Sequence, residues 1–318
     1  MTHVNLDFLP AHILTPIRCA MKEGQITIER LTEIRLRVKR RIYIHYMSSG
    51  ALACEKACDY IVNESDIRDV IDRLTEYSLY AYDDEIRQGF ITIRGGHRIG
   101  LAGQVIKEGG KIMNIKNISF LNIRLAHQIM GCGNNVMPYI ICKDRLLDTL
   151  IISPPGCGKT TLLRDIVRII SSGDGINEGL NVGLVDERSE IAGSYMGEPQ
   201  LEVGDRTDVM DACPKAEGML LLLRSMNPDV IAVDEIGSRE DVEAINYIIN
   251  CGCGILATVH GESIDDIRTR PILRKLVEER SFDRYIVLGR SRGIGTVESV
   301  FDERGNELLS MDYSYMCI

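Results

Sequence analysis

A glycine-rich segment at residues 153–161 has the residue types that bind phosphate groups. It reads Ser-Pro-Pro-Gly-Cys-Gly-Lys-Thr-Thr, follows an apolar run and precedes a helical pattern. Backbone N–H groups and a helix N-terminus form a positive concavity that suits phosphates. We expect Lys159 to reach the β- and γ-phosphates and Thr160 to ligate Mg²⁺. The segment predicts a P-loop for ATP and Mg²⁺, with the cofactor-binding residues Pro155, Gly156, Cys157, Gly158, Lys159, Thr160 and Thr161.

Two pairs of carboxylates follow apolar segments further along the chain. Asp234 and Glu235 come directly after Val230–Val233, and Asp186 and Glu187 end the segment that begins at Gly183. In an open parallel sheet, ligands bind beyond the carboxyl ends of the strands. We expect Asp234 to hold Mg²⁺ beside Thr160. Asp186, Glu187 and Glu235 all remain candidates for the catalytic base that polarises the attacking water.

A further apolar segment, at 254–259, ends near two side chains that can form hydrogen bonds. Thr258 and His260 stand where this strand would reach the ligand edge of the sheet. Either side chain could sense the γ-phosphate by hydrogen bonding. We therefore add His260 to the candidate catalytic residues.

Hydrolysis also requires positive charge at the γ-phosphate, which an arginine of a neighbouring subunit often supplies. The candidates for this role are Arg87, Arg94, Arg98 and Arg206. Besides the loop lysine, the C-terminal part offers Arg188 and Arg206 as obvious cations. Arg94 and Arg98 lie on a glycine-rich hairpin, which is a rigid mount for a charged group. We therefore expect one of these two to reach the γ-phosphate of the next subunit.

The spacing of apolar segments along the chain indicates which strands and helices position these groups. Apolar segments at 149–152, 182–185, 230–233 and 254–259 are mostly separated by helical patterns, which is typical of βαβ units and a parallel sheet. Two segments flanking Gly293 and Gly295 predict an antiparallel hairpin appended to this sheet. The C-terminal part is therefore expected to be an α/β domain with a mostly parallel sheet and helices on both faces.

The first part of the chain predicts a smaller α/β domain. Residues 26–46 alternate as strands do, a helix is expected from Asn63 to about Tyr80, and residues 89–105 predict a twisted antiparallel hairpin. Gly131–Asn135 is the best candidate linker. We predict an N-terminal domain at 1–134 and a nucleotide-binding domain at 135–318.

Charge and composition narrow the range of functions. The net charge of −9 divides into +3 for residues 1–150 and −12 for residues 151–318, which favours head-to-tail contact between copies. The acidic nucleotide-binding half argues against broad nucleic-acid binding. No apolar run is long enough for a membrane helix, and the start has no signal-peptide pattern. We expect a cytoplasmic protein with reduced cysteines, with peripheral attachment to a membrane left open.

The combination of motifs resembles the stage III sporulation protein AA family. The resemblance is carried by segments 153–161, 185–193, 229–237 and 93–103, and by Gly204–Asp208 with Cys213–Lys215. It spans nearly the whole chain. Ser153 replaces the first glycine of the usual P-loop, a change that serine accommodates at small cost because it adopts most of the same turn.

More widely, the chain is similar to the secretion ATPases of type II and type IV systems. This resemblance implies a RecA-like P-loop core, an acidic box at Asp186–Glu187, a Mg²⁺-strand motif at Asp234–Glu235 and a histidine box around Thr258–His260. It also implies N-terminal-domain arginines at Arg94 and Arg98 and a homo-oligomeric ring, commonly a hexamer. The family implies an ATPase in the mother cell that powers a channel to the forespore, with membrane channel proteins as partners.

Two other functions are compatible with the motifs. A nucleotide-regulated switch would bind ATP without releasing phosphate. A nucleic-acid-binding motor would give a salt-dependent complex with DNA or RNA. We expect no specific nucleic acid as a partner.

Overall fold

The computed structural model describes residues 6–48, 53–75, 82–109, 111–143, 145–173 and 178–309. Its contacts divide the chain into two compact units, and each is described by itself below. The N-terminal unit contains Met1–His127 together with Gly193–Gln200, and the C-terminal unit contains Gln128–Ala192 together with Leu201–Ile318. The domain boundary expected between residues 134 and 135 stays a prediction, since the contacts change unit at His127–Gln128 and assign one later segment to the N-terminal unit.

The N-terminal unit is built on a six-stranded antiparallel sheet with the strand order β3-β2-β1-β6-β5-β4. Its strands are β1 (Leu31–Arg37), β2 (Arg41–Met47), β3 (Ala53–Ile61), β4 (Phe90–Ile93), β5 (His97–Glu108) and β6 (Lys111–Arg124). Its helical elements are α1 (Ala11–Glu23), η1 (Ile28–Arg30), α2 (Glu64–Leu74) and α3 (Asp83–Gln88).

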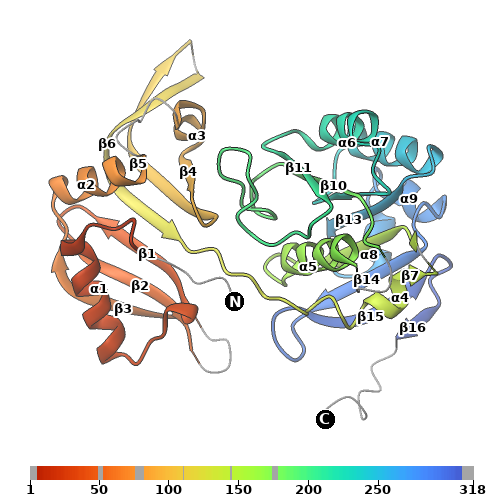
Figure 1. The fold of residues 1–318 in the computed structure, drawn as a ribbon, viewed down its shortest axis with the longest axis horizontal. Coiled ribbons are helices and arrows are strands. Elements are labelled where there is room, and N and C mark those ends of the chain that lie inside the picture. Colours follow the sequence, from red (N-terminus) through yellow and green to blue (C-terminus); the bar gives the residue numbers. More distant parts are fainter. Residues whose placement is uncertain are drawn as a thin grey trace. The chain divides into compact units, whose positions relative to one another are not determined.

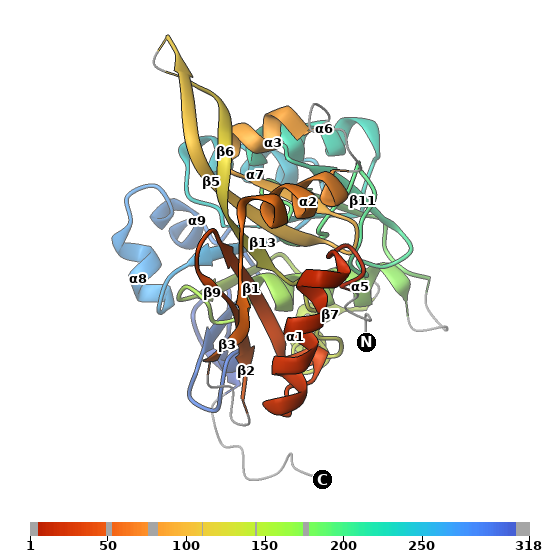
Figure 2. The same cartoon turned by 90° about the vertical axis from the view of Figure 1, so that its left-hand side faces the viewer.

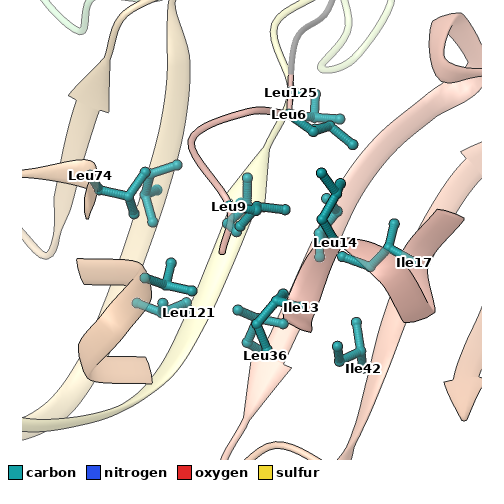
Figure 3. Close-up of a cluster of buried hydrophobic side chains, with 14 of the residues drawn as sticks. Leu6, Leu9, Ile13, Leu14, Ile17, Leu36, Ile42, Leu74, Leu121 and Leu125 are labelled. Carbon is teal, nitrogen blue, oxygen red and sulfur yellow. The ribbon is translucent and has the colours of Figure 1, made fainter. Parts of the chain in front are cut away.

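Alternation along the strands creates the core of this unit. Leu36 and Ile42 are fully buried on β1 and β2, and Ile13 and Ile17 of α1 pack with them in one hydrophobic cluster. Figure 3 shows these side chains turned toward one another. Burial of such side chains removes apolar surface from water and holds the helix on the sheet. The basic residues between 35 and 41 are not buried, so they form the solvated face of the strands.

The expected helix after Asn63 and the glycine-rich hairpin are both present. Asn63 accepts a hydrogen bond from the backbone N–H of Asp66 and completes a capping box, which fixes the start of α2. This helix ends at Leu74, and most of the remainder of its predicted length lies outside the described residues. Strands β4 and β5 form the predicted hairpin, and β5 pairs onward with β6. In Figure 2 the far end of the β5–β6 hairpin extends beyond α2 and α3.

The C-terminal unit, drawn largely in green and blue in Figure 1, contains an eight-stranded sheet. The strand order of this sheet is β11-β10-β12-β13-β9-β14-β15-β16. Six strands are parallel, and β15 and β16 add antiparallel pairs at one edge. Its strands are β9 (Thr149–Ser153), β10 (Val182–Asp186), β11 (Thr207–Asp211), β12 (Val230–Val233), β13 (Gly254–His260), β14 (Arg284–Gly289), β15 (Thr296–Asp302) and β16 (Glu307–Leu309). A small separate sheet pairs β7 (Ile141–Cys142) with β8 (Arg145–Leu146). The helices are α4 (Met137–Ile140), α5 (Lys159–Ser172), α6 (Lys215–Ser225), α7 (Arg239–Asn250), α8 (Ile264–Thr269) and α9 (Arg274–Glu278).

Helices cover both faces of this sheet. Leu150 and Ile152 of β9 belong to a buried cluster with residues of α6, α7, α8 and α9, whereas Ile151 belongs to a second cluster with residues of α5. Successive side chains of a strand point to opposite faces, so one strand can contribute to both clusters. The expected fold, a mostly parallel sheet with helices on both faces, is confirmed.

The strand register brings the candidate site residues to one edge. His260 of β13 pairs with Ser153 of β9, and Val233 at the end of β12 pairs with Ala257 of β13. The carboxyl ends of β9, β13 and β12 therefore lie next to one another. The part of the chain that the structure describes contains no helix long and apolar enough to cross a membrane. Its nine cysteines are all free thiols.

Candidate functional site

The phosphate loop joins β9 to α5 with the backbone that the motif requires. Gly156 and Gly158 have positive φ angles of 69° and 83°, a region that glycine adopts without strain. Helix α5 begins at Lys159, and among the described residues no side chain caps its N-terminus. The N-terminal N–H groups of a helix are suited to phosphate oxygens. Ser153, at the position of the usual first glycine, is fully buried, and its hydroxyl donates to the carbonyl of Pro154 at 2.9 Å.

The lysine of the loop is engaged by a carboxylate and a histidine from two neighbouring strand ends. Lys159 is 6% exposed and donates from Nζ to Oε1 of Glu235. His260 Nε2 lies 3.0 Å from the same carboxylate oxygen, and its Nδ1 lies 3.3 Å from Lys159 Nζ. Three groups that the sequence places far apart thus meet at the mouth of the loop.

The environment of Glu235 keeps its carboxyl group charged. Burial raises the pKa of Glu235, but the hydrogen bond and the charge of Lys159 outweigh burial, and His260 and Arg188 act in the same direction. The resulting pKa lies below its ordinary value. Glu235 also has a positive φ of 36°. Such a conformation costs a non-glycine residue roughly 1–3 kcal/mol and is common at functional sites.

Thr258 connects the two carboxylates at the end of β12. It is fully buried, donates from its hydroxyl to Asp234 Oδ1 and accepts from the backbone N–H of Glu235 at 2.6 Å. The Thr258 hydroxyl is therefore engaged by Asp234 and Glu235. His260, rather than Thr258, contacts the loop lysine. The sequence left the choice between these two as γ-phosphate sensor open.

Asp234 and Thr160 fit the magnesium site that the motif predicts. Thr160 Oγ1 lies 3.4 Å from Asp234 Oδ2. A hydroxyl and a carboxylate are the hard oxygen ligands that Mg²⁺ prefers, and phosphates and water complete its octahedron in nucleotide sites. Within the described ranges, no group of three or more His, Cys, Asp or Glu side chains could hold a metal by itself.

Asp186 is buried and bound by backbone N–H groups of the loop that follows β10. Its carboxylate is 1% exposed and accepts the backbone N–H groups of Glu190, Ile191 and Ala192 at 2.8–2.9 Å. Burial raises its pKa to about 6, against the effect of these hydrogen bonds. The buried Arg164 donates to the carbonyls of Glu190 and Ile191. Asp186 and Arg164 thus both hold the same loop, the first through its N–H groups and the second through its carbonyls.

Glu187 points to a different partner. Its carboxylate pairs with Nζ of Lys215, the first residue of α6. Glu187 and Glu235 therefore each pair with a lysine, but only the partner of Glu235 belongs to the phosphate loop. Of the three carboxylates that the sequence left open as base, geometry favours Glu235.

The arginine candidates lie in several places. Arg94 and Arg98 lie at the β4–β5 turn of the N-terminal unit, where Arg94 is exposed and the Arg98 guanidinium stacks 3.6 Å from the centre of the Phe90 ring. Arg87 donates to the carbonyl of Met113 at 3.2 Å in the same unit. In the C-terminal unit, Arg206 lies 3.5 Å from Glu178. The proposed action of Arg94 or Arg98 on another subunit stays a prediction.

Two arginines near the site were missed by reading the sequence. Arg290 follows β14 and donates from Nη2 to the carbonyl of Pro155 at 2.9 Å. Arg270 donates from Nη1 to the carbonyl of His260 at 2.5 Å and borders a cavity of about 290 Å³ that Glu235 and His260 also line. The expectation that Arg188 and Arg206 are the obvious further cations of this unit was therefore incomplete. The position of Arg290 just beyond a strand end was a usable signal.

Comparison with known proteins identifies the family and agrees with this fold. The family model described as "Sporulation stage III, protein AA" matches residues 10–308. The stage III sporulation protein AA of Bacillus subtilis (strain 168) is 43% identical over 278 residues, which cover 87% of this chain and 89% of the relative.

Solved structures are similar in fold. The ATPase DotB of Legionella pneumophila gives a TM-score of 0.57 at 15% identity, covering 90% of this chain and 78% of DotB. The pilus retraction motor PilT, solved with bound ADP, gives 0.53 at 16% identity, covering 86% and 77%. These likenesses show the RecA-like P-loop fold of secretion ATPases. By its matched family model and its close relative, the chain belongs to the stage III sporulation protein AA family.

Proposed function

We propose that this protein is a Mg²⁺-dependent ATPase that converts ATP and water to ADP and phosphate. The observation that carries the proposal is the meeting of Lys159, Glu235 and His260 at the mouth of the phosphate loop. These groups come from α5, from the loop after β12 and from β13. A glycine turn without a ligand would not require a buried lysine held between a carboxylate and an imidazole.

Each residue of the site has a role in this proposal. The loop from Pro155 to Thr161 binds the phosphates, and Lys159 leaves Glu235 to contact the β- and γ-phosphates. The freed Glu235 orients the attacking water and accepts its proton, and His260 senses the γ-phosphate. Mg²⁺, held by Thr160 and Asp234, supplies charge neutralisation when the nucleotide is bound.

We further propose that the ATPase works as a homo-oligomeric ring, with six subunits as the first expectation, on a membrane channel between mother cell and forespore. Membership of the sporulation family and the secretion-ATPase fold support this role. The two parts of the chain carry opposite net charge, which favours head-to-tail assembly. The protein would act from the mother-cell cytoplasm, at the membrane surface.

Phosphate release by the purified protein with Mg²⁺ and ATP tests the activity. Lys159→Ala should abolish release and shrink the thermal stabilisation by nucleotide, because binding stabilises the folded state by mass action. Lys215→Ala removes the other lysine that begins a helix and pairs with a carboxylate, and it should retain activity. Full activity in Lys159→Ala would refute the proposal. ATP binding without any phosphate release would point to a nucleotide switch instead.

Solution mass with and without nucleotide tests the ring. A strictly monomeric protein that hydrolyses ATP at its full rate would exclude a shared site. A salt-dependent complex with DNA or RNA would revive the nucleic-acid motor.

A further inference from the structure

The turn between β14 and β15, residues 290–295, lies against the phosphate loop. Arg290 donates from Nη2 to the carbonyl of Pro155 at 2.9 Å and from Nε to Cys157 Sγ at 3.2 Å. A Cβ atom built on Gly158 would lie 3.3 Å from Cα of Gly295 and 3.6 Å from Cγ2 of Ile294. The first residue of the turn, Arg290, and its last residues, Ile294 and Gly295, therefore all lie against the phosphate loop. The turn forms one wall of this loop.

The strand order indicates whether the γ-phosphate or the nucleoside of a bound nucleotide would lie against this wall. Strand β9, which carries the phosphate loop, lies between β13 and β14. The groups suited to hydrolysis, Asp234, Glu235 and His260, all come from the β13 and β12 side. The γ-phosphate must lie on that side for these groups to reach it. A triphosphate spanning the loop then directs its nucleoside toward β14 and the turn.

The side chains of the turn suit a nucleoside. Ile294 is 55% exposed, although it is a large apolar residue. A single exposed isoleucine is ordinary by itself, but this one lies beside the last glycine of a phosphate loop. Sites for small ligands commonly combine an apolar surface for the ring system with a few polar groups that fix its orientation.

We propose that the turn 290–295 is the nucleoside-side wall of the ATP site, in which Ile294 packs against the ribose and base and Arg290 positions the loop. The inference rests on the proposed nucleotide binding and names further residues of the same site. Arg290 acts through Pro155 and Cys157, so its loss should affect every ligand that enters the loop. Ile294 should affect only ligands that carry a nucleoside.

Two probes separate these effects. The Mg²⁺ complexes of a non-hydrolysable imido analogue of ATP and of inorganic tripolyphosphate share the phosphate chain, but only the first has a nucleoside. Calorimetric Kd values are measured for both with wild type, Ile294→Ser, Ile294→Leu and Arg290→Ala. Leu308→Ser is the matched control, because Leu308 is 43% exposed on β16, which pairs with the end of β15 remote from the turn. Circular dichroism without ligand confirms folding of each variant.

Ile294→Ser should weaken binding of the ATP analogue roughly fivefold or more, as expected for loss of a few buried methylene contacts. Binding of tripolyphosphate should stay near the wild-type value. Ile294→Leu should restore the analogue's affinity, and Leu308→Ser should change neither ligand. Arg290→Ala should weaken both ligands by a similar factor.

Unchanged affinity of Ile294→Ser for the analogue, or an equal loss for both ligands, would overturn the role of Ile294. An effect of Arg290→Ala on the analogue alone would overturn its role as a positioning residue. If wild type binds tripolyphosphate as tightly as the analogue, the nucleoside wall is refuted while the phosphate site stands. If wild type binds neither ligand, the proposed function itself fails.

Discussion

Replacing Glu235 by glutamine should make ATP bind more tightly and react more slowly. In the nucleotide-free protein, Glu235 pairs with Lys159, which is 6% exposed, while Glu235 is itself 29% exposed. Loss of one partner of a fully buried ion pair costs about 3–5 kcal/mol, and exposed pairs contribute far less. For this partly exposed pair we expect Glu235→Gln to lower the free energy of unfolding by roughly 1–3 kcal/mol.

The same ion pair must be given up when ATP enters the loop. Glutamine leaves Lys159 free for the phosphates and also removes a negative charge near them. Each 1.4 kcal/mol recovered in this way tightens binding by about tenfold, so recovery of roughly 1–3 kcal/mol should lower Kd by about five- to 150-fold. The rate of hydrolysis should fall by about 10²–10⁴, the usual contribution of a positioned general base. Calorimetry gives the Kd, and single-turnover phosphate release gives the chemical step.

Glu187→Gln is the matched control, since Glu187 pairs with Lys215 as Glu235 pairs with Lys159. It should cost stability but leave Kd and turnover near their wild-type values. Normal turnover in Glu235→Gln, together with loss of turnover in Glu187→Gln or Asp186→Asn, would move the base to the upstream acidic segment. Weaker ATP binding in Glu235→Gln would refute the competition between carboxylate and phosphate.

Three further predictions concern the magnesium ligand, a buried histidine and the arginines of the N-terminal unit. Asp234→Asn should give a rate loss that shrinks as the Mg²⁺ concentration rises, and a loss independent of Mg²⁺ would refute its role as ligand. Burial, with a neighbouring histidine, lowers the pKa of His97 to about 4, below the unfolded value of about 6.5. The unfolded state therefore binds more protons between these two pH values. The free energy of unfolding of the N-terminal unit should fall by up to roughly 3 kcal/mol as pH falls from about 6.5 to 4. Denaturant titrations of His97→Gln should show a smaller dependence of this free energy on pH. Arg94→Ala or Arg98→Ala should bind ATP normally and hydrolyse it roughly 10³–10⁵ times more slowly if that arginine acts on the next subunit. Mixing either with Lys159→Ala should then restore part of the activity, and no recovery in rings shown to be mixed would refute a shared site.

The elements around the site were predictable because their signals are local. Four apolar segments of strand length separated by helical patterns indicate a parallel sheet, and the sheet rule places whatever follows each strand at one edge. This rule predicted that Asp234 and His260 lie at the ligand edge, and the glycine-rich loop motif predicted the same for Lys159. The hairpin around Gly293 and Gly295 was also predicted, from two apolar segments and the glycines between them.

The choice among the acidic residues could not be made from the sequence. Asp186 and Glu235 both end or follow an apolar strand, so their local patterns are alike. In the structure, three backbone N–H groups from residues 190–192 point at Asp186, whereas the loop lysine reaches Glu235. Those contacts depend on how the chain turns after each strand, which apolar periodicity does not record.

The assignment of Gly193–Gln200 to the N-terminal unit was equally hidden. Tyr195 Oη lies 3.1 Å from Tyr82 Oη, and the amide side chain of Gln200 accepts from the backbone N–H of Gly95 at 2.9 Å. More than a hundred residues separate the partners of each pair along the chain. No pattern within a short window can indicate such contacts.

The sequence by itself determined the phosphate loop, the parallel sheet and the edge at which chemistry would occur, because backbone geometry and hydrophobic periodicity act over a few residues. Tertiary structure alone decided which carboxylate meets Lys159 and that Arg290 and Ile294 border the loop. The order β13-β9-β14 is responsible, since it places the ends of strands that are distant in sequence on either side of the same glycines. Side-chain partners across strands follow from that order, and strand order is a property of the packed sheet rather than of any one segment.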